Sequence, residues 1–261
     1  MDHDTVLALF DRQLRREARP DSDSTRIEQD GAVIRQLGLA HDWNGVVWSD
    51  LDEATADAAI AAQIDRFTAL GLDFEWKTYA HDAPADLGER LLAAGFTAED
   101  EQAVMVADVH ELPTDATLPE GVRLLPVTDA AGVDLLAEAA EQAFGTPNPT
   151  QRRRLLDHLE RGSETVSMVV AMAGDRPVCS ARMELVPGTD FAGLWGGGTV
   201  PEWRGRGIYR ALVAHRALQA AELGYRYLQV DASDQSRPIL QRLGFARLTS
   251  TTPYVRSVGP A

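Results

Sequence analysis

The sequence of 261 residues predicts a mixed α/β fold arranged as two domains of similar plan. Segments with apolar residues at helical spacing alternate with short segments rich in branched and aromatic residues, a pattern typical of helices that cover a sheet. The segment HELPTDATLPEG is rich in turn-forming and charged residues and separates these elements into two groups. We therefore expect one domain over 1–111, a linker over 112–120 and a second domain over 121–261.

The first group begins with a helix, because apolar residues recur at helical spacing from Val6 to Leu14, before Pro20. Asp30-Gly31 lies between two strand-like segments and predicts a two-residue hairpin loop, since glycine adopts a positive φ at little cost. The elements expected after it are, in chain order, a strand at 45–51, a helix at 52–70, a strand at 73–80, a helix at 85–95 and a strand at 101–109.

The second group repeats this plan with clearer signals. Its expected elements are a strand at 121–127, helices at 129–144 and 150–162, strands at 165–172, 178–186 and 190–200, a helix from 208 to 224, a strand at 225–232, a helix at 236–244 and a strand at 251–255. Both groups end alike, because the strand after Gly71 leads to a helix and Phe96 just as the strand after Gly224 leads to a helix and Phe245. We interpret this as a diverged duplication, the alternative being two unrelated helices that end in Gly-Phe.

Charge and composition exclude several classes of function. Forty acidic against 25 basic side chains give a net charge of -15, so the surface repels nucleic acids and anionic membranes. The chain starts without a secretory signal pattern, and no segment approaches the roughly 18 apolar residues of a membrane span. We expect a cytoplasmic monomer or homodimer. Cys179 has no neighbouring cysteine or histidine cluster, which indicates a buried side chain and no metal site.

Two glycines, Gly205 and Gly207, lie between a predicted strand and a predicted helix, within WRGRGIYRAL at 203–212. Because glycine lacks Cβ, backbone amides there can approach a ligand closely, and the helix N-terminus adds partial positive charge. Arg204 and Arg206 add charge suited to a pyrophosphate. The segment therefore predicts an anion site, and it fits a dinucleotide-binding loop poorly because Arg210 stands where the third glycine would be required.

This half resembles the GCN5-related N-acetyltransferase (GNAT) family, whose signature at this turn is Gln/Arg-x-x-Gly-x-Gly/Ala. Residues 204–209 match except at the last position, and SDQSRPILQRLGF at 233–245 is similar to the family's Asn-x-x-Ala-x-x-x-Tyr-x-x-x-Gly-Phe element. The resemblance implies that acetyl-coenzyme A is the cosubstrate, its pyrophosphate held by the turn and its pantetheine arm paired with the preceding strand. The residues it implies for that binding are Thr199, Val200, Arg204, Gly205, Arg206, Gly207, Ile208, Tyr209 and Ser233. The first half has no such turn, so the resemblance implies a degenerate GNAT-like domain there and one cofactor site per chain.

Because of two departures from the family pattern, the general acid that protonates the leaving thiolate is not assigned. Ser233 stands where the family usually has Asn, and Leu240 stands where it commonly has the Tyr that protonates the leaving thiolate. A thiol of pKa about 8.5 can leave with water as the acid, so the loss need not abolish activity. Tyr254 on the last strand and Tyr209 in the turn are the alternative donors, or they serve packing and cofactor contact.

The general base that deprotonates the amine is not assigned either. Glu184, on the strand next to the cofactor strand, is the first candidate and Glu202 the second, although a solvated glutamate at the end of a strand explains either. The resemblance implies that a bulged amide near Thr199 or Val200 polarises the thioester carbonyl.

These observations predict an acyltransferase of EC class 2.3.1 that transfers the acetyl group to a primary amine of a small molecule by direct attack in a ternary complex. Loops around 145–150 and the first half are expected to determine the acceptor. The alternatives are a protein amine as acceptor, a non-catalytic acyl-coenzyme A sensor, and a first half that is a separate interaction domain.

Overall fold

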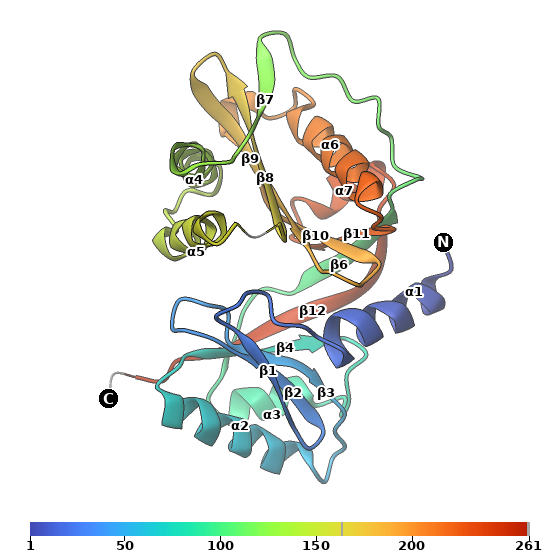
Figure 1. Ribbon diagram of the computed structural model, residues 1–261. Helices are drawn as coiled ribbons and strands as arrows, with labels where there is room; N and C mark the ends of the chain where they lie inside the picture. The colour runs from blue at the N-terminus through green and yellow to red at the C-terminus, as the bar shows by residue number, and fades with distance from the viewer. Residues whose placement is uncertain (163, 260–261) are drawn as a thin grey trace. The chain divides into compact units, whose positions relative to one another are not determined.

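The computed structural model describes residues 1–162 and 164–259, which form two compact units (Figure 1). Unit 1 comprises Met1–Met105, Asp231–Pro238 and the residues from Arg247 onward, and unit 2 comprises Val106–Val230 and Ile239–Ala246. The compact units thus divide the chain differently from the expected linker at 112–120, because the end of the chain belongs with the first half. The predicted mixed α/β architecture is confirmed in both units.

Unit 1 is built on a sheet that joins the first half to the last strand of the chain. Its strands, in spatial order, are β1 (Arg26–Asp30), β2 (Val33–Leu37), β3 (Gly45–Ser49), β4 (Phe74–Tyr79) and β12 (Ala246–Arg256), with the short β5 (Thr97–Ala98) beside β12. Its helices are α1 (His3–Phe10), the π-helical turn η1 (Asp11–Arg16), α2 (Ala56–Leu70) and α3 (Leu87–Ala93). β12 runs antiparallel to β4, with Thr251 opposite Tyr79 and Arg256 opposite Phe74.

Two local predictions in unit 1 are displaced. Asp30 pairs with Val33, so the hairpin loop is Gly31-Ala32 rather than Asp30-Gly31, with Gly31 at φ +58°. α2 begins at Ala56 rather than residue 52, because the Asp52 carboxylate accepts hydrogen bonds from the amides of Ala54 and Thr55 and holds a turn there.

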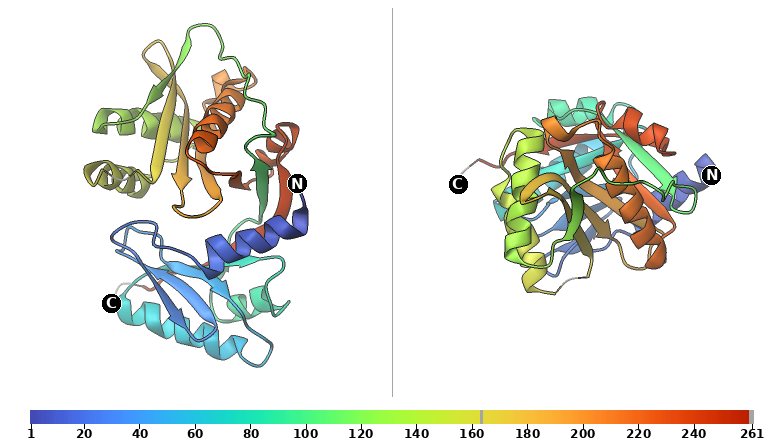
Figure 2. Two further views of the ribbon diagram at one scale, coloured as in Figure 1. Left: turned by 45° about the vertical axis from the view of Figure 1, so that its right-hand side comes forward. Right: turned by 90° about the horizontal axis from the view of Figure 1, so that it is seen from above.

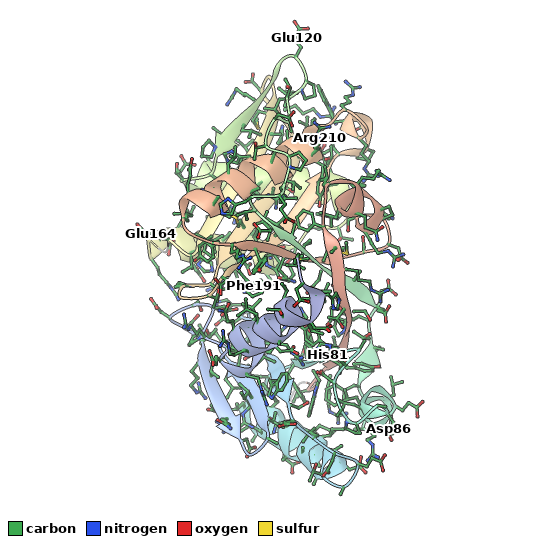
Figure 3. All side chains as sticks on the ribbon, turned by 90° about the vertical axis from the view of Figure 1, so that its right-hand side faces the viewer. His81, Asp86, Glu120, Glu164, Phe191 and Arg210 are labelled. Carbon is green, nitrogen blue, oxygen red and sulfur yellow. The ribbon has the colours of Figure 1, made fainter. Side chains whose placement is uncertain are left out.

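The two faces of the unit 1 sheet differ in chemistry. Phe74 and Trp76 on β4 pack with Phe67 of α2 and Leu91 of α3 in an apolar core, and the Phe67 and Phe74 rings stack at 4.1 Å. On the face of Tyr79 lies Arg15, fully buried below the Tyr79 ring and ion-paired with Asp11 and Asp82 at 2.7 Å. His81, labelled in Figure 3, also contacts Asp11. This face is therefore held by compensated charges.

The strands of unit 2 have helices on both faces. Its strands, in spatial order, are β11 (Tyr227–Ala232), β10 (Phe191–Thr199), β9 (Arg176–Leu185), β8 (Val166–Ala173) and β7 (Val122–Pro126). β10 and β11 are parallel and the other pairs antiparallel. The helices α4 (Ala130–Phe144) and α5 (Pro149–Glu160) cover one face and α6 (Ile208–Glu222) the other (Figure 2). The remaining elements are β6 (Gln102–Asp108), the 3-10 turn η2 (Pro201–Trp203) and α7 (Arg237–Arg242).

The helices on the first face begin and end as their sequences dictate. The Asp129 side chain accepts the Gly132 amide to start α4, and Asn148 accepts the Gln151 amide to start α5. Gly145, at φ +83°, ends α4. No helix within the described residues is both long and apolar enough to cross a membrane.

Candidate active site

A short turn, here called the glycine loop (204–207), connects η2 to α6. Gly205 has φ +72° and Gly207 φ +84°, values that favour glycine, and a Cβ at either position would meet no atom within 4 Å. Gly207 is the N-cap of α6, and no side chain among the described residues caps this helix end. The glycine loop thus adjoins open space at the start of α6, where the partial positive charge of the helix end suits a phosphate group.

The two arginines of the glycine loop have different surroundings. Arg204 donates from Nε to the Thr199 carbonyl at 3.0 Å and from its guanidinium to the Ala143 carbonyl at 2.9 Å. It therefore ties the loop to β10 and α4. Arg206 is exposed and lies over the Trp203 ring, with 4.6 Å between its guanidinium carbon and the ring centroid. Arg206 is thus the arginine whose charge is directed to solvent at the loop.

The strand before the loop contains a β-bulge. The pairing of β10 with β9 shifts register between Trp195 and Gly198, and Gly196 has φ +58°. The Ser180 hydroxyl donates to the Gly196 carbonyl at 2.9 Å and fixes the bulge from β9. The bulge thus precedes Thr199 and Val200, where a polarising amide was expected. Val200 is unsuited to that role, because its amide donates to the Val178 carbonyl at 3.0 Å.

The parallel ladder between β10 and β11 is short. It contains the pairs from Phe191 with Tyr227 to Gly193 with Gln229, whereas β10 continues to Thr199. The bulge therefore lies in the part of β10 that continues past this ladder.

Tyr209 and Cys179 lie beside the glycine-rich part of β10. A Cβ at Gly197 would lie 2.9 Å from the Tyr209 ring, so the ring packs against the bulge, and burial raises the pKa of Tyr209. Cys179 is fully buried, with its Sγ 3.1 Å from the Thr199 hydroxyl, and burial raises its thiol pKa to about 11. The expected burial of Cys179 is confirmed.

The two candidate bases differ in position. Glu184 lies on β9 opposite Gly193 of β10, and its carboxylate is 3.0 Å from Arg182 Nε with 36% of the side chain exposed. Glu202 lies in η2, 66% exposed, and its carboxylate is 3.5 Å from Arg176. Glu184 is therefore the one in the strand pair that contains the bulge.

Of the remaining candidates, Tyr254 and Ser233 belong to unit 1 and Leu240 belongs to unit 2. Tyr254 of β12 is opposite Trp76 of β4, and its hydroxyl lies close against Gly88. Ser233 Oγ accepts the Ser236 amide at 3.4 Å before α7. Leu240 of α7 is fully buried.

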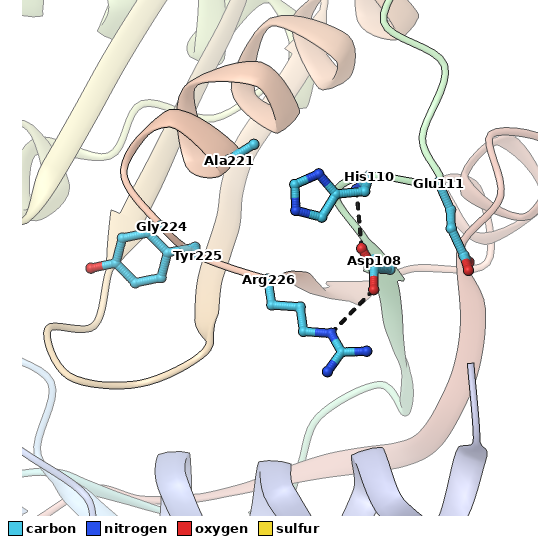
Figure 4. Close-up of a pocket in the computed structure, with 7 residues that line it drawn as sticks. All are labelled: Asp108, His110, Glu111, Ala221, Gly224, Tyr225 and Arg226. Atoms are coloured by element: carbon cyan, nitrogen blue, oxygen red, sulfur yellow. Dashed lines mark hydrogen bonds and ion pairs between the residues drawn. The ribbon is translucent and has the colours of Figure 1, made fainter.

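One hollow lies away from the glycine loop. It has a volume of about 490 Å³ and lies at the C-terminal end of α6, a 15-residue helix that spans about 22 Å (Figure 4). Its lining includes Asp108 and Arg226, joined by an ion pair of 3.2 Å. The Arg226 charge in this hollow is therefore already compensated by Asp108.

Residues 133–245, which include β8 to β11, the glycine loop and α6, match the sequence model of the Acetyltransferase (GNAT) family. This segment is a GNAT domain. A search of curated proteins gave no match.

Solved GNAT structures share the fold over nearly the whole chain. A GCN5-related N-acetyltransferase from Kribbella flavida is 17% identical, with a TM-score of 0.69, covering 96% of this chain and 94% of its own. One from Sphaerobacter thermophilus is 18% identical, with a TM-score of 0.59, covering 88% and 78%. A tandem GNAT protein from the clavulanic acid biosynthesis pathway is 13% identical, with a TM-score of 0.60, covering 99% and 95%. The fold of the first half is thus shared with this tandem GNAT protein.

The family match places the domain at 133–245 among the acyltransferases, and the GNAT family uses acetyl-coenzyme A. The glycine loop suits that molecule, because its amides and Arg206 match a pyrophosphate. Within 1–162 and 164–259, no cluster of three or more His, Cys, Asp or Glu side chains has the arrangement of a metal site.

The bulge was expected near Thr199 or Val200, but the register shift lies between Trp195 and Gly198. Three successive glycines, Gly196 to Gly198, interrupt a predicted strand, and glycine inside a strand is a known signal of a bulge or of close backbone approach. Applying that rule would have placed the bulge here rather than at Thr199 or Val200.

Proposed function

We propose that the chain is an N-acetyltransferase that transfers the acetyl group of acetyl-coenzyme A to a primary amine of a small molecule. The observation that carries the proposal is the glycine loop, with two left-handed glycines and open space before the uncapped start of α6. The match of residues 133–245 to the GNAT family supports the acyl-transfer chemistry.

The amides of Gly205, Gly207 and Ile208, with the Arg206 side chain, would hold the pyrophosphate. Arg204 would act by fixing the loop through the Thr199 and Ala143 carbonyls. The edge of β10 near Thr199 would pair with the pantetheine arm, and Tyr209 would border it. The roles of Val200 and Ser233 as cofactor contacts stay predictions.

Acetyl transfer needs an activated acyl group, a neutral amine and a protonated leaving group. Bound acetyl-coenzyme A supplies an activated thioester. Glu184 would take the proton from the attacking ammonium group, directly or through water, so that a neutral amine forms the new C–N bond as the C–S bond breaks. The nitrogen of the new C–N bond then releases its second proton to solvent, and the thiolate takes a proton from solvent, because the Leu240 side chain cannot donate one. Holding both reactants at the β10 bulge would supply much of the rate enhancement.

A small-molecule amine is favoured by the charge of the chain. A net charge of -15 attracts cationic ammonium compounds and repels nucleic acids. Protein amines carry the same ammonium group, so they form a second arm of the test. The cytoplasmic location and the monomeric or homodimeric state stay predictions of the sequence.

A second candidate function is a non-catalytic acyl-coenzyme A sensor, which the buried Leu240 favours because it removes the family's acid. Release of free thiol from acetyl-coenzyme A, measured with the full chain and a panel of small amines and peptides, tests both functions. Turnover with a small amine, and an acetylated product by mass spectrometry, are expected. Tight acetyl-coenzyme A binding without turnover on any acceptor would instead support the sensor.

A further inference from the structure

Arg216, on the face of α6 that packs against the sheet, is a buried cation, only 2% exposed. Its Nε donates to the Leu212 carbonyl and its Nη1 to the Arg182 carbonyl, each at 3.0 Å. Its Nη2 has no hydrogen-bond partner among the residues that the structure describes. Two carbonyl dipoles therefore hold the guanidinium in place and leave one nitrogen unused.

No carboxylate in the described part of the chain compensates this charge. The ionisable groups that act on the pKa of Arg216 are Tyr209 and Cys179, both neutral at physiological pH, and burial, the larger effect, lowers that pKa. Arg15 in unit 1 is equally buried but has Asp11 and Asp82 as ion-pair partners. An isolated buried charge is costly and is seldom kept without a partner, so Arg216 is suited to a ligand that brings the negative charge.

The unused nitrogen faces the bulge of β10. A Cβ at Gly197 would lie 3.8 Å from Arg216 Nη2, with the Tyr209 ring on its other side. Across the sheet, a Cβ at Gly196 would lie 3.5 Å from an Arg182 nitrogen. Arg182 has the Glu184 carboxylate as its partner, whereas no described carboxylate acts on Arg216, so the uncompensated charge beside the bulge is that of Arg216.

Arg216 lies on the side of the sheet where the acyl donor is expected to bind. Arg216 belongs to α6, the helix whose N-terminus forms the cofactor end of the glycine loop. The loop at 145–150, where acceptor specificity is expected, follows α4 on the opposite face (Figure 2). A negative group that reaches Arg216 thus comes with the donor rather than with the amine.

We propose that Arg216 binds the terminal carboxylate of a dicarboxylic acyl group, such as a succinyl or malonyl group, on coenzyme A. This rests on the proposed acyl-coenzyme A site and names the class of acyl chain that it accepts. The carboxylate would accept charge-assisted hydrogen bonds from Nη2. An acetyl group has no carboxylate and cannot accept these bonds.

The test compares dissociation constants, measured by calorimetry on the full chain, for succinyl-coenzyme A and butyryl-coenzyme A, which have acyl chains of equal length with and without the carboxylate. The wild type is expected to bind succinyl-coenzyme A about ten- to hundredfold more tightly. R216M should abolish this ratio. R210M is the matched control, since Arg210 lies on the same helix with a 54% exposed side chain (Figure 3) and should keep the ratio.

Equal affinity of the wild type for the two thioesters would overturn the proposal, as would a ratio that survives in R216M. If R216M does not fold, the wild-type comparison decides alone. If no coenzyme A thioester binds the wild type, the proposed function itself fails, which is distinguishable from equal binding of both.

Discussion

The glycine loop can be tested by adding one methyl group to Gly207. Gly207 has φ +84°, and an L-residue in the left-handed region costs about 1–2 kcal/mol, so G207A should lower the melting temperature by about 2–8 °C. The added Cβ projects into open space, so no clash within the described chain adds to this cost. If that space receives the pyrophosphate, the variant also loses about one charge-assisted hydrogen bond of about 1.5–3 kcal/mol, which weakens coenzyme A binding about ten- to hundredfold.

Gly224 provides the matched control at the other end of the same helix. It also has φ +84°, and a Cβ there would likewise meet nothing within 4 Å. G224A should therefore lose similar stability in thermal unfolding but bind coenzyme A like the wild type in calorimetry. Wild-type affinity in G207A, or an equal loss of affinity in G224A, would refute the assignment of the loop.

Three further predictions concern single side chains. E184Q should lower kcat about 10²- to 10⁴-fold with an unchanged coenzyme A dissociation constant, whereas E202Q should keep kcat; full activity of E184Q would exclude it as the base. Cys179, with its thiol pKa raised by burial to about 11, should resist iodoacetamide at pH 8 in the folded protein and react after unfolding, as mass spectrometry would show; modification of the folded chain would contradict its burial. Burial alone would raise the pKa of Glu28, but hydrogen bonds from Arg35, Arg66 and a third arginine lower it from 4.5 to about 2. Its stabilising contribution is thus complete above pH 4.5 and lost as the pH falls towards 2, so the stability difference between wild type and E28Q in urea unfolding should shrink over that window; a constant difference would argue against the ion pairs.

Local patterns predicted most elements because their causes are local. The apolar period and the capping residues Asp129 and Asn148 define α4 and α5 where they were expected. The start of α2 was missed because Asp52 captures nearby amides, a competition between side chain and helix that periodicity does not reveal.

The pairing of strands that are far apart in the chain could not be predicted from the sequence. Nothing in TTPYV indicates that β12 pairs with β4, more than 170 positions earlier in the chain, because the period of a strand identifies its faces and not its neighbour. The expected linker at 112–120 therefore differs from the division into compact units.

The candidate site was predictable in part. The glycine spacing identified the loop, since positive φ requires glycine there. Arg204 holds the loop in place through hydrogen bonds to carbonyls of β10 and α4. Arg216 is notable because its buried Nη2 has no hydrogen-bond partner among the described residues. Such facts follow from packing, which residue type alone does not determine.

A crystal structure of the full chain with coenzyme A would show directly where the cofactor binds. We expect the pyrophosphate against the amides of Gly205 and Gly207 at the start of α6, and the thiol near the Gly196–Gly197 bulge of β10. Coenzyme A bound elsewhere, such as in the hollow beside Asp108 and Arg226, would contradict this expectation.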